Sequence, residues 1–185
     1  MIPAIIAVVV LGLPVLWLIG TYNGFVRIGQ HVRESWSGID VELKRRYDLI
    51  PNLVSTAKGY ASHEKEVFER VVQARQAAVS STGSPASQAE DENQLVGAMR
   101  SMFALVESYP KIKADQQFLN LQNELVDTED RIAASRRFFN GNVREMRNLR
   151  EAFPTSIVGS LAGIEEPTFF GIDDDTERAA PRVQV

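Results

Sequence analysis

Histidines and carboxylates are the residues whose types and spacing could support metal binding or catalysis in this sequence. His63-Glu64 begins like a zinc-binding H-E-x-x-H motif, but no second histidine follows at the required spacing. The sequence has two histidines, His31 and His63, and none lies in the long helix predicted from about 114 to 153, so a di-metal centre built from paired E-x-x-H elements is excluded. Glu124, Asp127 and Glu129 are followed by Arg131 and Arg136 in the next turns, a spacing that favours ion pairs within a helix. We therefore expect no metal, no cofactor and no catalytic centre.

The other common catalytic motifs and nucleic-acid binding are also excluded. The sequence has no phosphate-binding G-x-x-x-x-G-K-[ST] loop, no G-x-G-x-x-G fingerprint and no G-x-S-x-G elbow. It contains no cysteine, which removes disulfides and thiolate chemistry. A net charge of −4 argues against a surface that neutralises phosphates. We expect no nucleic-acid partner.

The densest run of basic residues is L-K-R-R-Y-D, residues 43–48. Pairing with acidic neighbours or with carboxylates of a later helix is the simplest interpretation. Contact with anionic lipid and bridging between subunits remain alternatives. A remaining enzyme hypothesis places buried Asp40, Arg46 or Glu129 in a cleft, but spacing along the chain cannot show that these groups converge.

The first predicted element of the sequence is an apolar N-terminal segment. No charged side chain appears before Arg27, and residues 1–19 are all apolar, glycine or proline. This length suits a membrane span of about 20 residues, with Trp17 and Tyr22 at the interface. A cleaved signal peptide is the alternative, but the basic start and the cleavage site are missing. Basic residues that follow the span favour an N-terminus outside and the remainder in the cytoplasm.

Apolar residues then recur at helical spacing to about residue 72, with a break or kink expected at Pro51. The polar stretch 80–91 predicts the main loop between helices, and a shorter helix follows before a turn at Pro110. From about 114 to 153, large apolar residues recur at strict seven-residue intervals, which indicates one long helix. These residues are Phe118, Leu125, Ile132, Phe139, Met146 and Phe153.

The predicted fold is all-α. A transmembrane anchor (1–22) continues into an antiparallel bundle of three to four long helices (23–154), and an extended C-terminal tail follows (155–185). The tail carries an apolar patch at Phe169-Phe170 and an acidic run at 173–175. We expect no strand.

Two sequence blocks resemble signatures of a known family. The block W-S-G-I-D-V-E-L-K-R-R-Y-D-L-I-P-N-L-V at 36–54, continued by K-G-Y-A-S-H-E at 58–64, is similar to the hallmark of the LemA family of bacterial membrane proteins. The block F-L-N-L-Q-N-E-L-V-D-T-E-D-R-I-A-A-S-R-R-F-F-N at 118–140 is similar to the second family signature. Departures occur at Gln117, Phe139 and Gly141, where the family more often has other residues, and they weaken any polar catalytic role there.

The resemblance implies an N-terminal transmembrane helix with its N-terminus outside, a cytoplasmic helical bundle, and location in the bacterial inner membrane. It implies no established enzymatic activity, and it links some members to the shaping of membranes. We therefore predict a non-catalytic, self-associating scaffold whose partners are the lipid bilayer and further copies of the chain. The alternative is an adaptor that presents the surface around residues 45–47 and the acidic tail to another membrane protein, such as a protease or transporter. The candidate interaction or structural positions are Trp36, Asp40, Arg45, Arg46, Tyr47, Asp48, Pro51, Asn52, Glu129, Arg131 and Arg136.

Overall fold

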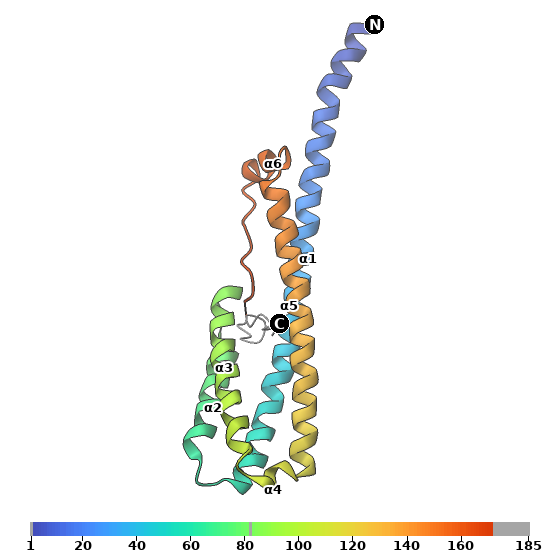
Figure 1. Ribbon diagram of the computed structural model, residues 1–185. Helices are drawn as coiled ribbons and strands as arrows, with labels where there is room; N and C mark the ends of the chain where they lie inside the picture. The colour runs from blue at the N-terminus through green and yellow to red at the C-terminus, as the bar shows by residue number, and fades with distance from the viewer. Residues whose placement is uncertain (1, 82, 172–185) are drawn as a thin grey trace, which may run out of the picture. The chain divides into compact units, whose positions relative to one another are not determined.

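The protein is all-helical throughout the residues that its computed structural model describes, 2–81 and 83–171, which contain no strand. This confirms the predicted fold class. The helices in chain order are α1 (Ile2–Tyr60), α2 (Lys65–Ser80), α3 (Pro85–Val106), α4 (Pro110–Lys113), α5 (Gln116–Glu151) and α6 (Thr155–Leu161) (Figure 1).

The chain divides into two compact units. The described part of the first comprises residues 2–40 and 134–168, and that of the second comprises residues 41–133 and 169–171. Helices α1 and α5 each contribute to both units, whereas α2, α3 and α4 belong to the second and α6 to the first.

In the first unit, α5 runs antiparallel to α1. The rings of Trp36 and Phe139 lie 5.3 Å apart, and Met146, further along α5, packs on Phe25 and Ile28, which come earlier along α1. Val158 of α6 completes this small core. The unit therefore places α6 beside α1, next to the C-terminal end of α5.

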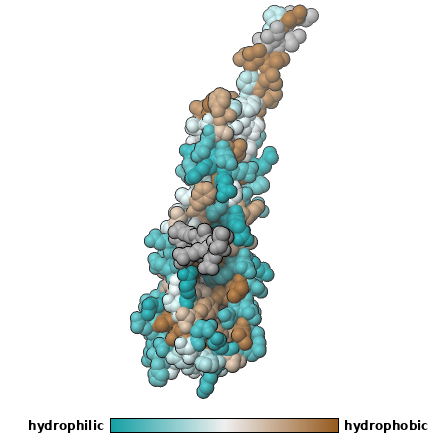
Figure 2. All heavy atoms as spheres, viewed as in Figure 1, coloured by the Kyte–Doolittle hydropathy of each residue, from teal (hydrophilic) through white to brown (hydrophobic). Residues whose placement is uncertain are grey.

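The N-terminal part of α1 exposes a continuous set of apolar side chains. Figure 1 shows that this part of α1 extends beyond α5 and α6, and Figure 2 shows brown, apolar side chains gathered along it. The structure thus contains a helix that is long and apolar enough to cross a membrane, as the sequence predicts. Its exposed large apolar residues from 9 to 19 are Val9, Val10, Leu11, Leu13, Val15, Leu16, Trp17, Leu18 and Ile19.

In the second unit, α2 and α3 pack side by side. The predicted loop at 80–91 is too long, because α3 begins at Pro85. The Ser84 side chain caps the helix by accepting a hydrogen bond from the Ser87 backbone N–H, and Pro85 occupies the first helical turn, where its missing donor costs little. The polar residues 86–91 are therefore helical.

Of the break or kink predicted at Pro51, the break is wrong, because α1 continues through Pro51 to Tyr60, and the kink stays a prediction. A proline at this position leaves the carbonyl of Tyr47, four residues earlier, without its helical N–H donor. Arg75 of α2 replaces that donor, with its Nε 2.6 Å from the Tyr47 carbonyl oxygen. A side chain of a neighbouring helix thus supplies what the helix itself cannot.

The seven-residue stripe of α5 is buried from Phe118 to Met146. Its predicted last member, Phe153, lies beyond the end of α5 and is 83% exposed. Within the predicted extended tail, residues 155–161 instead form α6, where the Thr155 hydroxyl donates to the carbonyls of Leu149 and Ala152. Phe170 is fully buried, and the acidic run at 173–175 lies outside the described residues.

Candidate functional site

The most polar feature of the buried interior is a charge cluster around Arg46 in the second unit. Arg46 is 0% exposed and lies on α1. Its Nη1 donates to both carboxylate oxygens of Glu129 on α5 at 3.0 Å, and its Nη2 pairs with Glu92 on α3. Glu92 also accepts a hydrogen bond from the Tyr47 hydroxyl. One guanidinium therefore connects three helices.

The local sequence explains how these side chains meet. Leu43, Ile50 and Leu53 set the buried face of α1, and Arg46 occupies the same face one turn after Leu43. A buried arginine is tolerated only when its planar donors are matched by carboxylates, and Glu92 and Glu129 provide this match.

Burial and charge act against each other in this cluster. Burial lowers the pKa of Arg46, but the Glu129 and Glu92 carboxylates outweigh it and raise that pKa above its ordinary value. Burial raises the pKa of Glu92, and the Arg46 guanidinium and the Tyr47 hydroxyl oppose this rise. The pKa of Tyr47 is raised by burial and by its hydrogen bond to Glu92. Arg46 is thus held in its charged form.

The cluster has the properties of a structural cross-link. Arg46 and Glu92 are both fully buried, whereas the Glu129 side chain is 38% exposed. Arg46 and Tyr47 of α1 both donate to Glu92, which ties α1 to α3.

The structure unites three of the predicted positions: Arg46, Tyr47 and Glu129. Asp40, Arg45, Asp48 and Arg131 are exposed and lie outside this cluster. The predicted adaptor surface at residues 45–47 is therefore wrong in two of its three residues, because Arg46 and Tyr47 turn into the interior and only Arg45 is exposed. The enzyme hypothesis loses Asp40, which it expected to be buried, because Asp40 is exposed.

The remaining predicted positions are not part of the Arg46 cluster. Trp36 is half-buried against Phe139, and Arg136 is buried within the first unit. Pro51 and Asn52 are exposed on α1. The Asn52 carbonyl accepts hydrogen bonds from the hydroxyls of Ser55 and Thr56.

Two buried polar contacts were not predicted. Glu92 shares one face of α3 with Ala89, Leu95 and Met99, so an acidic residue on an apolar stripe was the available signal. In the first unit, Asn142 donates to the Ser35 hydroxyl at 3.1 Å, on the boundary between α1 and α5. Asn142 also donates to the His31 carbonyl, so a shift of one helix along the other would remove the bonds that Asn142 makes to α1, which favours one register.

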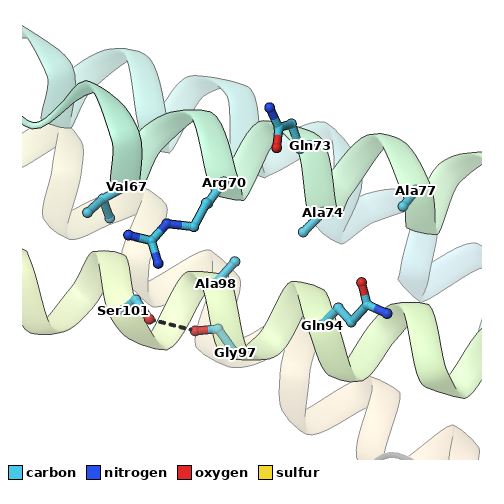
Figure 3. Close-up of a pocket in the computed structure, with 9 residues that line it drawn as sticks. All are labelled: Val67, Arg70, Gln73, Ala74, Ala77, Gln94, Gly97, Ala98 and Ser101. Atoms are coloured by element: carbon cyan, nitrogen blue, oxygen red, sulfur yellow. Dashed lines mark hydrogen bonds between the residues drawn. The ribbon is translucent and has the colours of Figure 1, made fainter.

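An open groove of about 560 Å³ lies between α2 and α3 (Figure 3). Small side chains line it, including Ala74, Gly97 and Ala98. Its charged member, Arg70, pairs with Glu66 on the same helix at 3.2 Å. No group of three or more His, Asp or Glu side chains placed to hold a metal occurs in the described part of the chain.

In the described residues this is a helical protein with an apolar N-terminal helix and a buried ion-pair cluster. A sequence profile of the LemA family matches residues 35–185. The chain belongs to the LemA family.

Similar proteins support a membrane-associated helical protein. The magnetosome protein MamQ of Magnetospirillum gryphiswaldense is 24% identical over 178 residues, which cover 83% of this chain and 65% of MamQ. Magnetosome protein MamQ 2 of Paramagnetospirillum magneticum matches to the same extent. Protein LemA of Metamycoplasma hominis is 25% identical over 122 residues, which cover 66% of this chain and 56% of that protein. The chain thus spans less than two thirds of the length of these relatives.

Proposed function

We propose that this protein is a non-catalytic scaffold, anchored in the bacterial cytoplasmic membrane, that self-associates and organises or remodels the membrane. The observation that carries the proposal is the single helix α1. It begins with an exposed apolar stretch suited to a bilayer and continues without interruption to Tyr60, where it provides core residues. Such a helix couples the helical domain to the bilayer without a flexible linker.

The internal chemistry supports a structural role. Arg46 binds carboxylates of two other helices, and Asn142 binds Ser35 within the first unit. These contacts hold helices in register rather than offering groups to a substrate. Rigid helical bodies suit assembly, because little conformational entropy is lost when they associate.

Orientation follows from the residues after the span. Arg27 and Arg33 are exposed on α1 and come directly after its apolar part. Basic residues are enriched on the cytoplasmic side of membrane helices. We therefore assign an outward N-terminus and a cytoplasmic helical domain. The similarity to proteins named magnetosome proteins supports a role in building a subcellular structure.

Reconstitution into liposomes tests the membrane part of this proposal. Full-length protein at increasing density should change liposome shape when imaged in vitreous ice. A version that lacks the residues before Tyr22, added to the same liposomes, should leave them spherical. Liposomes that stay spherical at every density of inserted full-length protein would contradict membrane remodelling.

The adaptor is the second candidate. The open groove between α2 and α3 is the observation that favours it, since small side chains on two helices leave room for a segment of another protein. Capture with full-length bait from membrane extracts distinguishes the candidates. A stoichiometric foreign membrane protein supports the adaptor, and recovery of the bait alone supports the scaffold.

A further inference from the structure

Helix α6 presents an apolar face that no part of its own unit covers. Phe153, just before the helix, is 83% exposed, and Leu161 and Ile157 are 81% and 48% exposed. Ile157 and Leu161 lie four residues apart on α6 and share one face, so they form an apolar strip, and Phe153 is exposed just before the helix begins. The opposite face is buried, because Val158 belongs to the small core of the first unit.

The position of α6 is fixed by close packing against α1. Gly159 lies against the Phe25 ring, and a Cβ atom at Gly159 would approach the ring Cζ to 3.2 Å. A crevice of about 390 Å³ next to this contact is lined by Leu18, Ile19 and Tyr22 of α1 and by Val158, Leu161 and Ala162. Helix α6 therefore lies at the level where the apolar stretch of α1 ends.

The segment after α6 holds the helix in this position. Glu166 pairs with Arg147 and lies 3.4 Å from Arg150, so two arginines near the end of α5 bind it. The chain is thus held before α6, where it continues from α5, and after α6, where Glu166 pairs with the arginines of α5. The exposed strip keeps a fixed direction relative to the apolar part of α1.

We propose that α6 is a second membrane contact, which lies in the interface of the leaflet adjoining the helical domain and inserts Phe153, Ile157 and Leu161 at the acyl-chain boundary. The occupant of the strip is lipid, because the crevice is continuous with the lipid-facing surface of α1 and is lined by Tyr22, an interfacial aromatic. An amphipathic helix can lie in the plane of the interface with its apolar face toward the acyl chains, and the proposal gives α6 this position. The inference rests on the membrane anchor of the proposed function but does not require self-association.

The absence of cysteine from the sequence permits a direct test with single-cysteine variants of the full-length protein. Ile157→Cys and Leu161→Cys are labelled with an environment-sensitive dye and reconstituted into phosphatidylcholine–phosphatidylglycerol liposomes that contain acyl-chain-brominated lipid. Both positions are exposed, so the labels do not disturb the core. Bromine should quench both labels several-fold more than in liposomes of unbrominated lipid.

Two matched variants make the outcome interpretable. Val15→Cys, in the exposed apolar part of α1, should be quenched if the anchor spans the bilayer. Ala134→Cys is exposed on α5, and a rise of about 1.5 Å per residue places it about 25 Å from Glu151, so it should not be quenched.

Each pattern of quenching has one meaning. Quenching at positions 15, 157 and 161 but not at 134 supports the second contact. Quenching at 15 alone overturns it and leaves the anchor intact, and no quenching at 15 overturns the anchor itself. Disulfide-linked dimers of Leu161→Cys without lipid quenching would show that a second copy of the chain covers the strip.

Discussion

At the scale of single residues, Arg46 is the side chain whose removal should cost most. Arg46→Met leaves the Glu92 carboxylate buried without its cation. Loss of one partner of a buried pair typically costs about 3–5 kcal/mol, so we expect a decrease of that order in the free energy of unfolding. Urea unfolding of the full-length protein in detergent, followed by circular dichroism, measures it.

Two further variants separate the effect of losing a positive charge from the effect of leaving a buried carboxylate unpaired. Arg45→Met changes an exposed neighbour and should alter the free energy of unfolding by less than about 0.5 kcal/mol. In Arg46→Met/Glu92→Leu neither buried charge remains, and most of the lost stability should return. A double variant as unstable as Arg46→Met would show that shape, rather than the unpaired charge, determines the loss.

Asp115 makes the stability of the second unit dependent on acidity. The Tyr60 hydroxyl donates to it at 2.7 Å and the Phe118 N–H at 2.8 Å, at the start of α5. These bonds, that of Tyr60 foremost, lower the pKa of Asp115 below its ordinary 3.8. The charged form is favoured by folding, so its contribution is present above the ordinary pKa and is lost as the pH falls through the lowered pKa.

Asp115→Asn tests this pH dependence. Asparagine retains a capping oxygen, so stability near neutral pH should change little. Below about pH 4 the variant should lose stability less steeply than the wild type. Denaturation curves at several pH values check this, and parallel acid dependence of the two proteins would refute the assignment.

At the scale of elements, α1 passes through Pro51 because α2 supplies a hydrogen-bond donor. Arg75→Met should cost about 1–3 kcal/mol, since it leaves the Tyr47 carbonyl without a donor. In a Pro51→Ala background the helix regains its own N–H, and the same Arg75 change should cost clearly less. Equal costs in both backgrounds, measured by unfolding, would show that the Arg75 contact does not compensate for the proline.

Two glycines should respond in opposite directions. Gly159→Val places side-chain atoms against Phe25, and overpacking of this kind costs about 1–3 kcal/mol. Gly141→Ala enters open space on α5 and should stabilise by about 0.5–1 kcal/mol through helix propensity. Unfolding of both variants measures the difference, and a neutral Gly159→Val would contradict close packing of α6 on α1.

Features that repeat along the chain were the predictable ones. The seven-residue stripe of α5 and the apolar start of α1 follow from spacing and composition. The structure matches the stripe from Phe118 to Met146 and the apolar start from Val9 to Ile19.

Features that depend on a partner from a distant segment were not predictable. The continuity of α1 at Pro51 depends on Arg75, and the Arg46 site depends on Glu92, which lies just after the stretch predicted to be a loop. Helix α6 is too short for a clear periodic pattern, and it packs on Phe25, a residue of α1 that is far away in the sequence.

At the scale of the whole molecule, the protein has an apolar helix that suits the bilayer and polar clusters that hold helices together. Arg46 with its carboxylates serves the second unit, and the Asn142–Ser35 pair serves the first. Both contacts restrict helix movement, which suits the proposed scaffold.

The mass of the detergent-solubilised full-length protein tests directly whether the protein self-associates. Light scattering with particle imaging gives the number of chains per particle, and the version that lacks the residues before Tyr22 serves as the comparison. We expect a closed particle of defined stoichiometry for the full-length protein and a smaller species without the anchor. A strict monomer in both forms would contradict the self-associating scaffold.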